Sequence, residues 1–325
     1  MNEQHEALKK FSYQINYAIN HYTKHGLKAT DYSNIIIAGL GGSGIGGQLV
    51  KAIFSNQAPV PIACVADYHL PAYANEKTLV ITGSYSGNTE ETISVYHEAK
   101  AKGCKILAVT TGGKLAELAK ADGTYMLLME AGFQPRMALG FSLTFLVLLV
   151  GELLGNDLTT DMKAVAAAFE DYQPYVDDAQ AMFEAIKTKL KSKFVVLTDG
   201  PCEPIGIRFA QQIQENAKHE CFVHALPEMN HNVIESYYGT LDSVYFFINS
   251  NQNERVSARM DFLTGLLEVE NHKIIHMELE QFNLLSLYEI IYRLDWVSLL
   301  VADERKVDSL NVPNIKSLKE YLDQV

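Results

Sequence analysis

Short, uninterrupted apolar runs alternate with longer segments of mixed polarity along the 325-residue chain. The clearest run is Ile35 to Ala38, whose β-branched side chains are typical of a parallel strand buried on both faces. Similar runs predict further strands at residues 61–65, 78–83, 105–110, 125–129, 193–198, 221–225, 244–249 and 273–277. Because these strands alternate with helical segments, the pattern predicts an α/β fold with parallel sheets flanked by helices.

The segments between these runs carry apolar residues at a helical spacing. Residues 8–26 predict one amphipathic helix ahead of the first strand, because their apolar side chains recur about every 3.6 positions. Helices are also expected at residues 137–154, 204–216 and 284–303. The segment 137–154 is the most apolar, but polar residues interrupt it and it is short for a membrane span. We therefore predict a buried helix there.

A glycine-rich turn follows the strand at 35–38. Six of the nine residues from Gly39 to Gly47 are glycine, which lets the chain turn sharply and lets a ligand approach its backbone. A helix is expected to begin near Ser43 or Gly44, and its unpaired N–H groups would favour a phosphate or carboxylate. No Gly-Lys-Ser/Thr follows, which excludes the loop of nucleoside triphosphatases. A tight turn without a ligand is the alternative interpretation.

The segment SYSGNTEET, at residues 84–92, follows the strand at 78–83. Open α/β sheets bind ligands at the carboxyl ends of such strands. Ser84, Ser86 and Thr89 offer three hydroxyl groups, and Thr89 begins a predicted helix whose first turn holds two acids. Neither loop contains Lys or Arg, so a single phosphate monoester is a better ligand than a polyphosphate. The alternative is that these hydroxyls only cap the helix.

Composition narrows the class of partner. The net charge of −12 argues against nucleic acid or an anionic membrane, since either would require a basic patch. The four cysteines show no CxxC spacing and no zinc-site pattern, so we interpret them as buried thiols and expect no metal site. Charged residues near the N-terminus stand where a signal peptide would need an apolar core, so a cytoplasmic location is expected.

Together the two loops resemble those of a known family. GGSGIGG at residues 41–47 and SYSGNTEET are similar to the phosphosugar-binding signature of sugar isomerase (SIS) domains. The chain resembles in particular the bifunctional phosphoglucose/phosphomannose isomerases, and the likeness covers nearly the whole sequence. It implies two doubly wound, flavodoxin-like SIS domains at residues 1–156 and 191–325, with a helical connection at 157–190.

The resemblance also implies site residues. The sugar phosphate would contact Gly42, Ser43, Ser84, Ser86 and Thr89. The catalytic residues would be Arg136 of a Pro-Arg segment, Glu215 of a Glu-Asn-Ala-Lys element, His231 of a Pro-Glu-x-Asn-His-Asn loop and Lys319 of the tail.

The chain departs from the family pattern in two places. Val233 stands where the family commonly has an acid, and Ser309 stands where it has a proline. Two further histidines in the same region, His219 and His224, match no family position, and we assign them no role.

The implied residue types fit aldose–ketose isomerisation, which moves a proton between C1 and C2 through a cis-enediolate. A carboxylate such as that of Glu215 suits the role of base, because it can reach either carbon. Arg136 would stabilise the enediolate oxygens with a permanent charge, and His231 would serve as acid and base in ring opening. The resemblance implies hexose phosphates as substrates, no metal or organic cofactor, and a homodimer with shared active sites.

Two other classes of function stay open. A catalytically silent SIS protein would bind a phosphosugar and regulate a partner, although Glu215 and His231 argue against it. A nicotinamide-dependent dehydrogenase would bind its dinucleotide at the glycine loop and the ribose at Asp67, just past the second strand. That interpretation leaves the hydroxyl-rich second loop unexplained.

Overall fold

The structure is a computed structural model that describes residues 3–238, 242–270, 272–322 and 324. The chain divides into two compact units. The N-terminal unit comprises Lys9–Asp171, and the C-terminal unit combines the segment through Leu8 with Tyr172–Val325. The predicted domain boundaries near residues 156 and 190 stay predictions.

The N-terminal unit is built on a five-stranded parallel sheet with the order β2-β1-β3-β4-β5. This is the flavodoxin-like, doubly wound order, so the predicted fold class is confirmed for this unit. Its strands are β1 (Asn34–Ala38), β2 (Ile62–Val65), β3 (Thr78–Ser84), β4 (Lys105–Thr110) and β5 (Tyr125–Leu128). Its helices are α2 (Phe11–His21), α3 (Gly41–Phe54), α4 (Glu90–Ala101), α5 (Gly113–Ala121), α6 (Leu139–Leu153) and α7 (Thr159–Ala168), with the short turns η1 (Ala29–Asp31) and η2 (Pro135–Met137).

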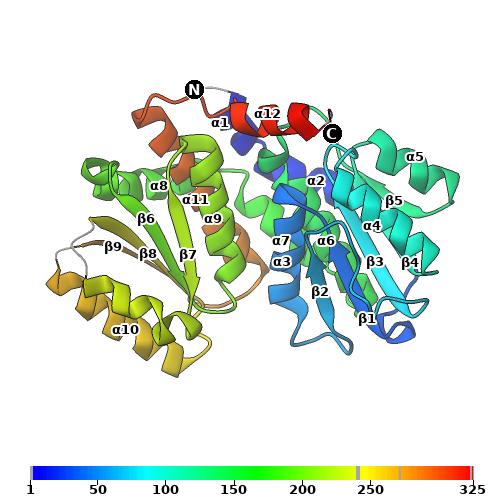
Figure 1. Cartoon of the computed structure of the whole chain (residues 1–325), viewed down its shortest axis with the longest axis horizontal. Helices are drawn as coiled ribbons and strands as arrows, with labels where there is room; N and C mark the ends of the chain where they lie inside the picture. The colour runs from blue at the N-terminus through cyan, green and yellow to red at the C-terminus, as the bar shows by residue number, and fades with distance from the viewer. Residues whose placement is uncertain (1–2, 239–241, 271, 323, 325) are drawn as a thin grey trace. The chain divides into compact units, whose positions relative to one another are not determined.

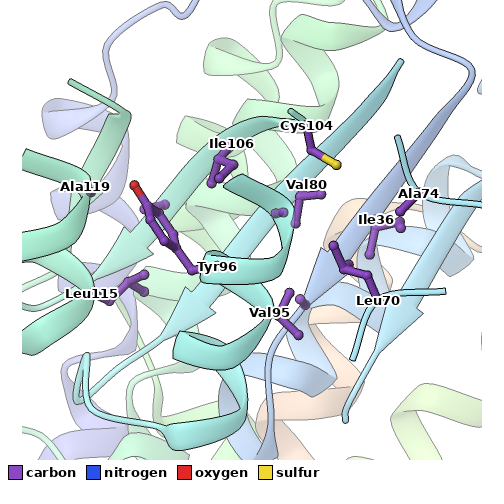
Figure 2. Packing of buried hydrophobic residues seen from close by; sticks show 13 residues of the cluster. Ile36, Leu70, Ala74, Val80, Val95, Tyr96, Cys104, Ile106, Leu115 and Ala119 are labelled. Carbon is purple, nitrogen blue, oxygen red and sulfur yellow. The ribbon is translucent and has the colours of Figure 1, made fainter. Parts of the chain in front are cut away.

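Alternating strand residues divide the core of this unit into two layers. Ile36 and Val80 pack with Tyr96 of α4 and Leu115 of α5 in one buried cluster, which Figure 2 shows from close by. The neighbouring Ile37 points to the opposite face, where α3 comes so close that only glycine fits beside it. Helices α4 and α5 therefore cover one face of the sheet and α3 and α6 the other (Figure 1).

The C-terminal unit contains a four-stranded parallel sheet with the order β7-β6-β8-β9. Its strands are β6 (Lys193–Thr198), β7 (Cys221–Ala225), β8 (Ser243–Asn249) and β9 (Lys273–Glu278). The helices are α8 (Gln173–Ile186), α9 (Glu203–Ala217), α10 (Glu254–Val269), α11 (Leu284–Glu304) and α12 (Pro313–Leu322), with α1 (Glu3–Lys9) contributed by the N-terminal segment. Short turns lie at η3 (Lys187–Lys189), η4 (Glu228–His231) and η5 (Val233–Tyr238).

The two faces of this second sheet are also covered by helices. Phe209 of α9 packs against Phe246 of β8 with ring centres 4.9 Å apart. On the opposite face, Leu263 of α10 joins a buried cluster with Val195 and Phe247. The predicted α/β fold with helices on both faces of parallel sheets is thus confirmed for this unit too.

The strand predictions are confirmed throughout, since no strand end differs from its expected position by more than one residue. The single helix expected at 8–26 is wrong, because α1 ends at Lys9 and α2 begins at Phe11. The chain passes from one unit to the other at this break. His5 of α1 pairs with Asp303 at 3.0 Å in the C-terminal unit, whereas Gln14 of α2 donates to the Met137 carbonyl at 2.8 Å in the N-terminal unit.

Three further expectations need correction. Helix α3 begins at Gly41, ahead of the expected Ser43 or Gly44, because the Leu40 carbonyl already accepts the first helical hydrogen bonds. The tail holds a helix, α12, that we did not predict. Three of the cysteines are buried thiols as expected, but Cys64 is only half-buried, on the edge strand β2. Among the described residues, no helix has both the length and the apolar character that crossing a membrane requires.

Candidate active site

The predicted phosphate loops meet at the carboxyl edge of the N-terminal sheet. Strands β1 and β3 are direct neighbours, with Ala38 opposite Thr82. The chain leaves β1 for β2 on one side and later returns to β3 on the other, so this is the topological switch point of the sheet. Helices α3 and α4 both begin here. Two sets of unpaired helix N–H groups therefore lie beside the same edge, where the helix dipoles favour an anion.

Ser43 joins the first loop to the second. Its hydroxyl oxygen accepts a hydrogen bond from the backbone N–H of Tyr85 at 3.2 Å. Because the oxygen is the acceptor, the Ser43 hydroxyl hydrogen is still available to a ligand. The bond also sets the spacing between the loops, since it links the first turn of α3 to the chain just after β3.

The second loop is shaped by its own hydroxyl groups. Ser84 is 1% exposed, and its Oγ accepts the Gly87 N–H at 3.1 Å and lies 2.8 Å from Thr89 Oγ1. The exposed Ser86 accepts the Asn88 N–H at 3.2 Å. Gly87 has a φ of +69°, and a Cβ there would lie 1.8 Å from the Gly112 carbonyl oxygen, so only glycine fits.

The geometry bears on the alternative that these hydroxyls only cap α4. Thr89 is the N-cap residue of α4, but its side chain makes no capping hydrogen bond. It is directed to Ser84 instead. The α4 N–H groups are therefore left for another acceptor, which is what an anion site at this helix start requires.

Arg136 lies in the short turn η2, directly beside the first loop. A Cβ added to Gly42 would stand 2.9 Å from the Pro135 carbonyl oxygen and 3.7 Å from the Arg136 Cα. The Arg136 side chain is 5% exposed. The absence of a side chain at Gly42 thus allows the arginine segment to approach the predicted phosphate site closely.

Glu215 lies in the last turn of α9 in the C-terminal unit. Helix α9 is held against α11 by a buried ion pair, Arg208 to Asp295 at 2.6 Å, and by Asn216 donating to Ser298 at 2.9 Å. Burial raises the pKa of Asp295, and the charge of Arg208 opposes this shift. The Glu215 side chain is half-buried, and its carbonyl accepts a hydrogen bond from Lys218.

His231 stands at the end of η4, after β7, and its side chain is exposed. Because β6 and β7 are parallel, α9 must run back from the carboxyl edge of the sheet to its amino edge. Arg305 marks that amino edge by donating both to the Ala217 carbonyl at the end of α9 and to the Leu190 carbonyl ahead of β6, at 3.1 and 3.0 Å. Glu215 and His231 therefore lie at opposite edges of the sheet.

The neighbours of His231 explain the departure from the family pattern. Val233 packs against the apolar cluster beneath α10, and its backbone N–H donates to the Asn232 side chain at 2.7 Å. Asn230 accepts a long hydrogen bond from Arg259 of α10 at 3.4 Å. The loop is thus held by packing and by its asparagines at the position where the family commonly has an acid.

The remaining candidates lie elsewhere in the C-terminal unit. Lys319 is exposed on α12. His219 bonds the Ser192 carbonyl at 2.8 Å and packs on Phe194, and burial lowers its pKa. Burial also lowers the pKa of His224 on β7. These contacts account for His219 as a structural residue.

The predicted site residues therefore form two groups, one in each unit. The N-terminal unit brings together the phosphate loops and the Arg136 segment. The C-terminal unit holds Glu215, His231 and Lys319. Sequence reasoning missed Tyr85, which contacts the first loop and the turn that leads to Arg136; a tyrosine between two serines at the end of a buried strand was the available signal. No group of three or more His, Cys, Asp or Glu side chains suited to a metal ion occurs in the described parts of the chain.

Comparison with known proteins defines the class of this chain. Residues 30–150 match the family model of the SIS domain, and residues 175–322 match that of the bacterial phospho-glucose isomerase C-terminal SIS domain. The fold is shared with the C-terminal domain of glucosamine-fructose-6-phosphate aminotransferase from Francisella tularensis, at a TM-score of 0.73 and 14% identity, over 94% of this chain and 97% of that one. The chain is a double SIS-domain protein.

Two relatives identify the family. The bifunctional phosphoglucose/phosphomannose isomerase of Caldicellulosiruptor bescii is 34% identical over 323 residues, covering 95% of both chains. The enzyme of the same name from Aquifex aeolicus is 32% identical over 301 residues, covering 90% of this chain and 91% of its own. The chain belongs to the bifunctional phosphoglucose/phosphomannose isomerase family.

Proposed function

We propose that this enzyme interconverts glucose 6-phosphate and mannose 6-phosphate with fructose 6-phosphate through a cis-enediolate. Membership in an isomerase family selects this function over a silent phosphosugar sensor and over a dehydrogenase. The observation that carries the choice of substrate is the meeting of two helix N-termini and two hydroxyl-bearing loops at the switch point of the N-terminal sheet.

The phosphate of the sugar is anchored at these two loops. The N–H groups of α3 and α4 and the hydroxyls of Ser43 and Thr89 supply hydrogen-bond donors, and the helix dipoles supply partial positive charge. Ser86 lies at the exposed rim of the loop and can add a third hydroxyl. Ser84 is buried and shapes the loop that presents the other groups. Holding the phosphate fixes the reacting carbons, so this binding supports catalysis as well as affinity.

The chemical steps are assigned to four side chains. Glu215 is the base that moves the proton between C1 and C2. Arg136 stabilises the charge of the enediolate oxygens and cannot lose its own charge. His231 donates and accepts the ring-opening proton, and Lys319 contacts the substrate. The mechanism assigns no step to a metal or an organic cofactor.

The working form is a homodimer with shared active sites. Glu215 and His231 lie at opposite edges of the C-terminal sheet, with the length of β7 between them. Five residues of strand alone span about 16 Å, and the two residues stand at opposite edges of the sheet, which disfavours their acting on one hexose within a single chain. Two chains related by two-fold symmetry can bring Glu215 of one and His231 of the other to a single sugar. We place this enzyme in the cytoplasm.

The direct test is an isomerase assay with glucose 6-phosphate and mannose 6-phosphate as separate substrates, each with and without EDTA. Turnover of both substrates, unchanged by EDTA, is expected. Glu215→Gln should lower kcat by at least about 100-fold while phosphosugar binding is retained, the usual effect of removing a general base. Glu203→Gln, in the first turn of the same helix, is the matched control and should keep wild-type turnover. Absence of turnover by the wild-type protein would refute the proposal.

A further inference from the structure

Tyr85 lies between the two serines of the second loop and has no role in the function proposed above. Its side chain is 9% exposed. Its main chain and its hydroxyl group bond different segments, all within the N-terminal unit. Tyr85 therefore connects parts of the candidate site that are far apart in the sequence.

The hydroxyl end of Tyr85 holds the turn at residues 130–133. The hydroxyl donates to the Glu130 carbonyl at 2.8 Å and accepts the Phe133 N–H at 3.0 Å. Burial raises the pKa of Tyr85, so the group stays neutral and can both donate and accept. The Tyr85 hydroxyl oxygen thus bonds the first and the last residue of the turn at 130–133.

The main chain of Tyr85 holds the phosphate loops. Its N–H donates to Ser43 Oγ at 3.2 Å, which joins the two predicted phosphate loops. Its carbonyl accepts from Thr111, through the backbone N–H at 3.2 Å and the side-chain hydroxyl at 2.6 Å. The loop after β4 therefore braces the same residue from a third direction.

The turn at 130–133 leads directly into the Arg136 segment. Phe133 is two residues before Pro135, and its ring packs on Phe141 of α6 at 5.3 Å. Tyr13 of α2 bonds the Glu130 side chain. From the opposite direction, the Pro135 carbonyl is in close contact with Gly42. The Arg136 backbone is thus fixed between the first phosphate loop and the turn that Tyr85 closes.

We propose that Tyr85 is a positioning residue that sets the placement of Arg136 relative to the bound phosphate. The main-chain bonds of Tyr85 fix the two phosphate loops, and its hydroxyl fixes the Arg136 segment. One rigid aromatic residue thus sets the distance between the phosphate site and the arginine that stabilises the enediolate. The inference rests on the proposed isomerase function and on the role of Arg136 in it. A displacement of about 1 Å at such a position costs up to about 100-fold in rate.

The first test is Tyr85→Phe, which removes the hydroxyl and leaves the ring and both main-chain bonds. We expect kcat for glucose 6-phosphate to fall at least about 10-fold, while the inhibition constant of inorganic phosphate stays within about twofold. Tyr96→Phe is the matched control. Tyr96 is fully buried in the same unit, and its hydroxyl bonds Asp122 at 3.1 Å and Thr124 at 2.9 Å, among residues that the proposal gives no part in binding or catalysis. Tyr96→Phe should lower the melting temperature without lowering kcat.

The second test separates positioning through Arg136 from a general structural effect. In an Arg136→Lys background, which itself lowers kcat, the loss caused by Tyr85→Phe should largely disappear, because the group it positions is already impaired. Thr111→Val, which removes the side-chain bond to the Tyr85 carbonyl, should instead weaken phosphate inhibition and raise KM. Thr111→Val also serves as the test if Tyr85→Phe does not fold. An unchanged KM in Thr111→Val would then contradict the role of the Tyr85 main chain in holding the phosphate loops.

The outcomes distinguish the inference from the proposed function. A wild-type protein without isomerase activity overturns the proposed function. An active wild type with unimpaired Arg136→Lys overturns the role of Arg136, and with it this inference. The inference alone is overturned if the wild type is active and Arg136→Lys is impaired, but Tyr85→Phe has an unchanged kcat. It is also overturned if Tyr85→Phe lowers kcat by the same factor in the wild-type and Arg136→Lys backgrounds.

Discussion

Glu215 and His231 lie at opposite edges of the same four-stranded sheet. Glu215 is in the last turn of α9, before β7 begins, and His231 is at the end of η4, after β7 ends. Their separation is a consequence of topology, because a helix between parallel strands must return to the amino edge before the next strand begins. The family resemblance assigns both residues to one reaction. The symmetric dimer proposed above would reconcile the resemblance with this geometry.

The first prediction is complementation between two inactive variants. Glu215→Gln and His231→Ala are each expected to be inactive alone, and they are mixed after reversible dissociation. Random pairing makes about half of the dimers mixed, and each mixed dimer regains one intact site of two, so activity should recover to about a quarter of wild type. Native mass spectrometry verifies the exchange. Exchange without recovery would mean that both residues act in the same chain, because every site would then lack one of them.

The second prediction concerns the phosphate loops. Ser43→Ala combined with Thr89→Ala removes two hydroxyl donors from the anion site and should raise KM for the sugar phosphate at least about fivefold, which corresponds to about 1 kcal/mol, the net worth of one hydrogen bond. Steady-state kinetics measure the effect, and inorganic phosphate should compete with substrate in the wild type. Ser55→Ala is the control, because Ser55 lies at the other end of α3, where its hydroxyl donates to the Lys51 carbonyl at 2.7 Å. A double variant with wild-type KM would show that these hydroxyls do not bind substrate.

The third prediction contrasts two glycines. Gly42→Ala introduces a Cβ 2.9 Å from the Pro135 carbonyl oxygen and should displace the Arg136 segment, lowering kcat about 10-fold or more. Gly265→Ala, in the middle of α10, meets no atom within 4 Å and should stabilise the protein by about 0.5–1 kcal/mol with unchanged turnover. Denaturant melts and kinetics on both variants decide the matter. Equal turnover in the two would contradict the close packing of Gly42 on the arginine segment.

The fourth prediction is a pH dependence of stability that comes from Glu152 on α6. Burial opposes its ionisation, but hydrogen bonds from the Tyr22 hydroxyl at 2.5 Å and from the N–H groups of Gly26 and His25 outweigh that effect. The pKa of Glu152 is therefore lowered from its ordinary value of 4.5. A carboxyl whose pKa is lowered by folding stabilises the protein fully above the unfolded value and loses that contribution as the pH falls through the folded value.

Glu152→Gln should accordingly reduce the free energy of unfolding by about 1–2 kcal/mol at pH 7, and the difference from wild type should shrink steadily below about pH 4.5. Urea melts across pH 3 to 7 measure it. Tyr22→Phe removes one of the hydrogen bonds to Glu152 and should weaken the same pH dependence. A difference between Glu152→Gln and wild type that stays constant with pH would rule out the ionised, hydrogen-bonded carboxylate.

The amino-acid sequence by itself determined the local elements and the chemistry of the loops. The β-branched runs such as Ile35–Ala38 become strands within one residue of their expected ends, because a continuous apolar run of that length is stable only when buried in a sheet. The glycine loop and SYSGNTEET both stand at the carboxyl edge, because parallel strands bring all strand-to-helix turns to that edge. The likeness to the isomerase family, confirmed by the relatives, also rests on these local segments.

Only the tertiary structure decided which distant residues meet. Tyr85 contacts Ser43, Thr111 and Glu130, which lie between 26 and 45 positions away, and no local pattern encodes such pairings. The break between α1 and α2 likewise depends on two different cores, since His5 and Gln14 are buried in different units although they are close together in the sequence. Glu215 and His231 are only 16 positions apart in the sequence, yet β7 separates them by its full length. Sequence spacing records neither the direction of a strand nor the packing of one element on another, and these two properties place the residues of the site.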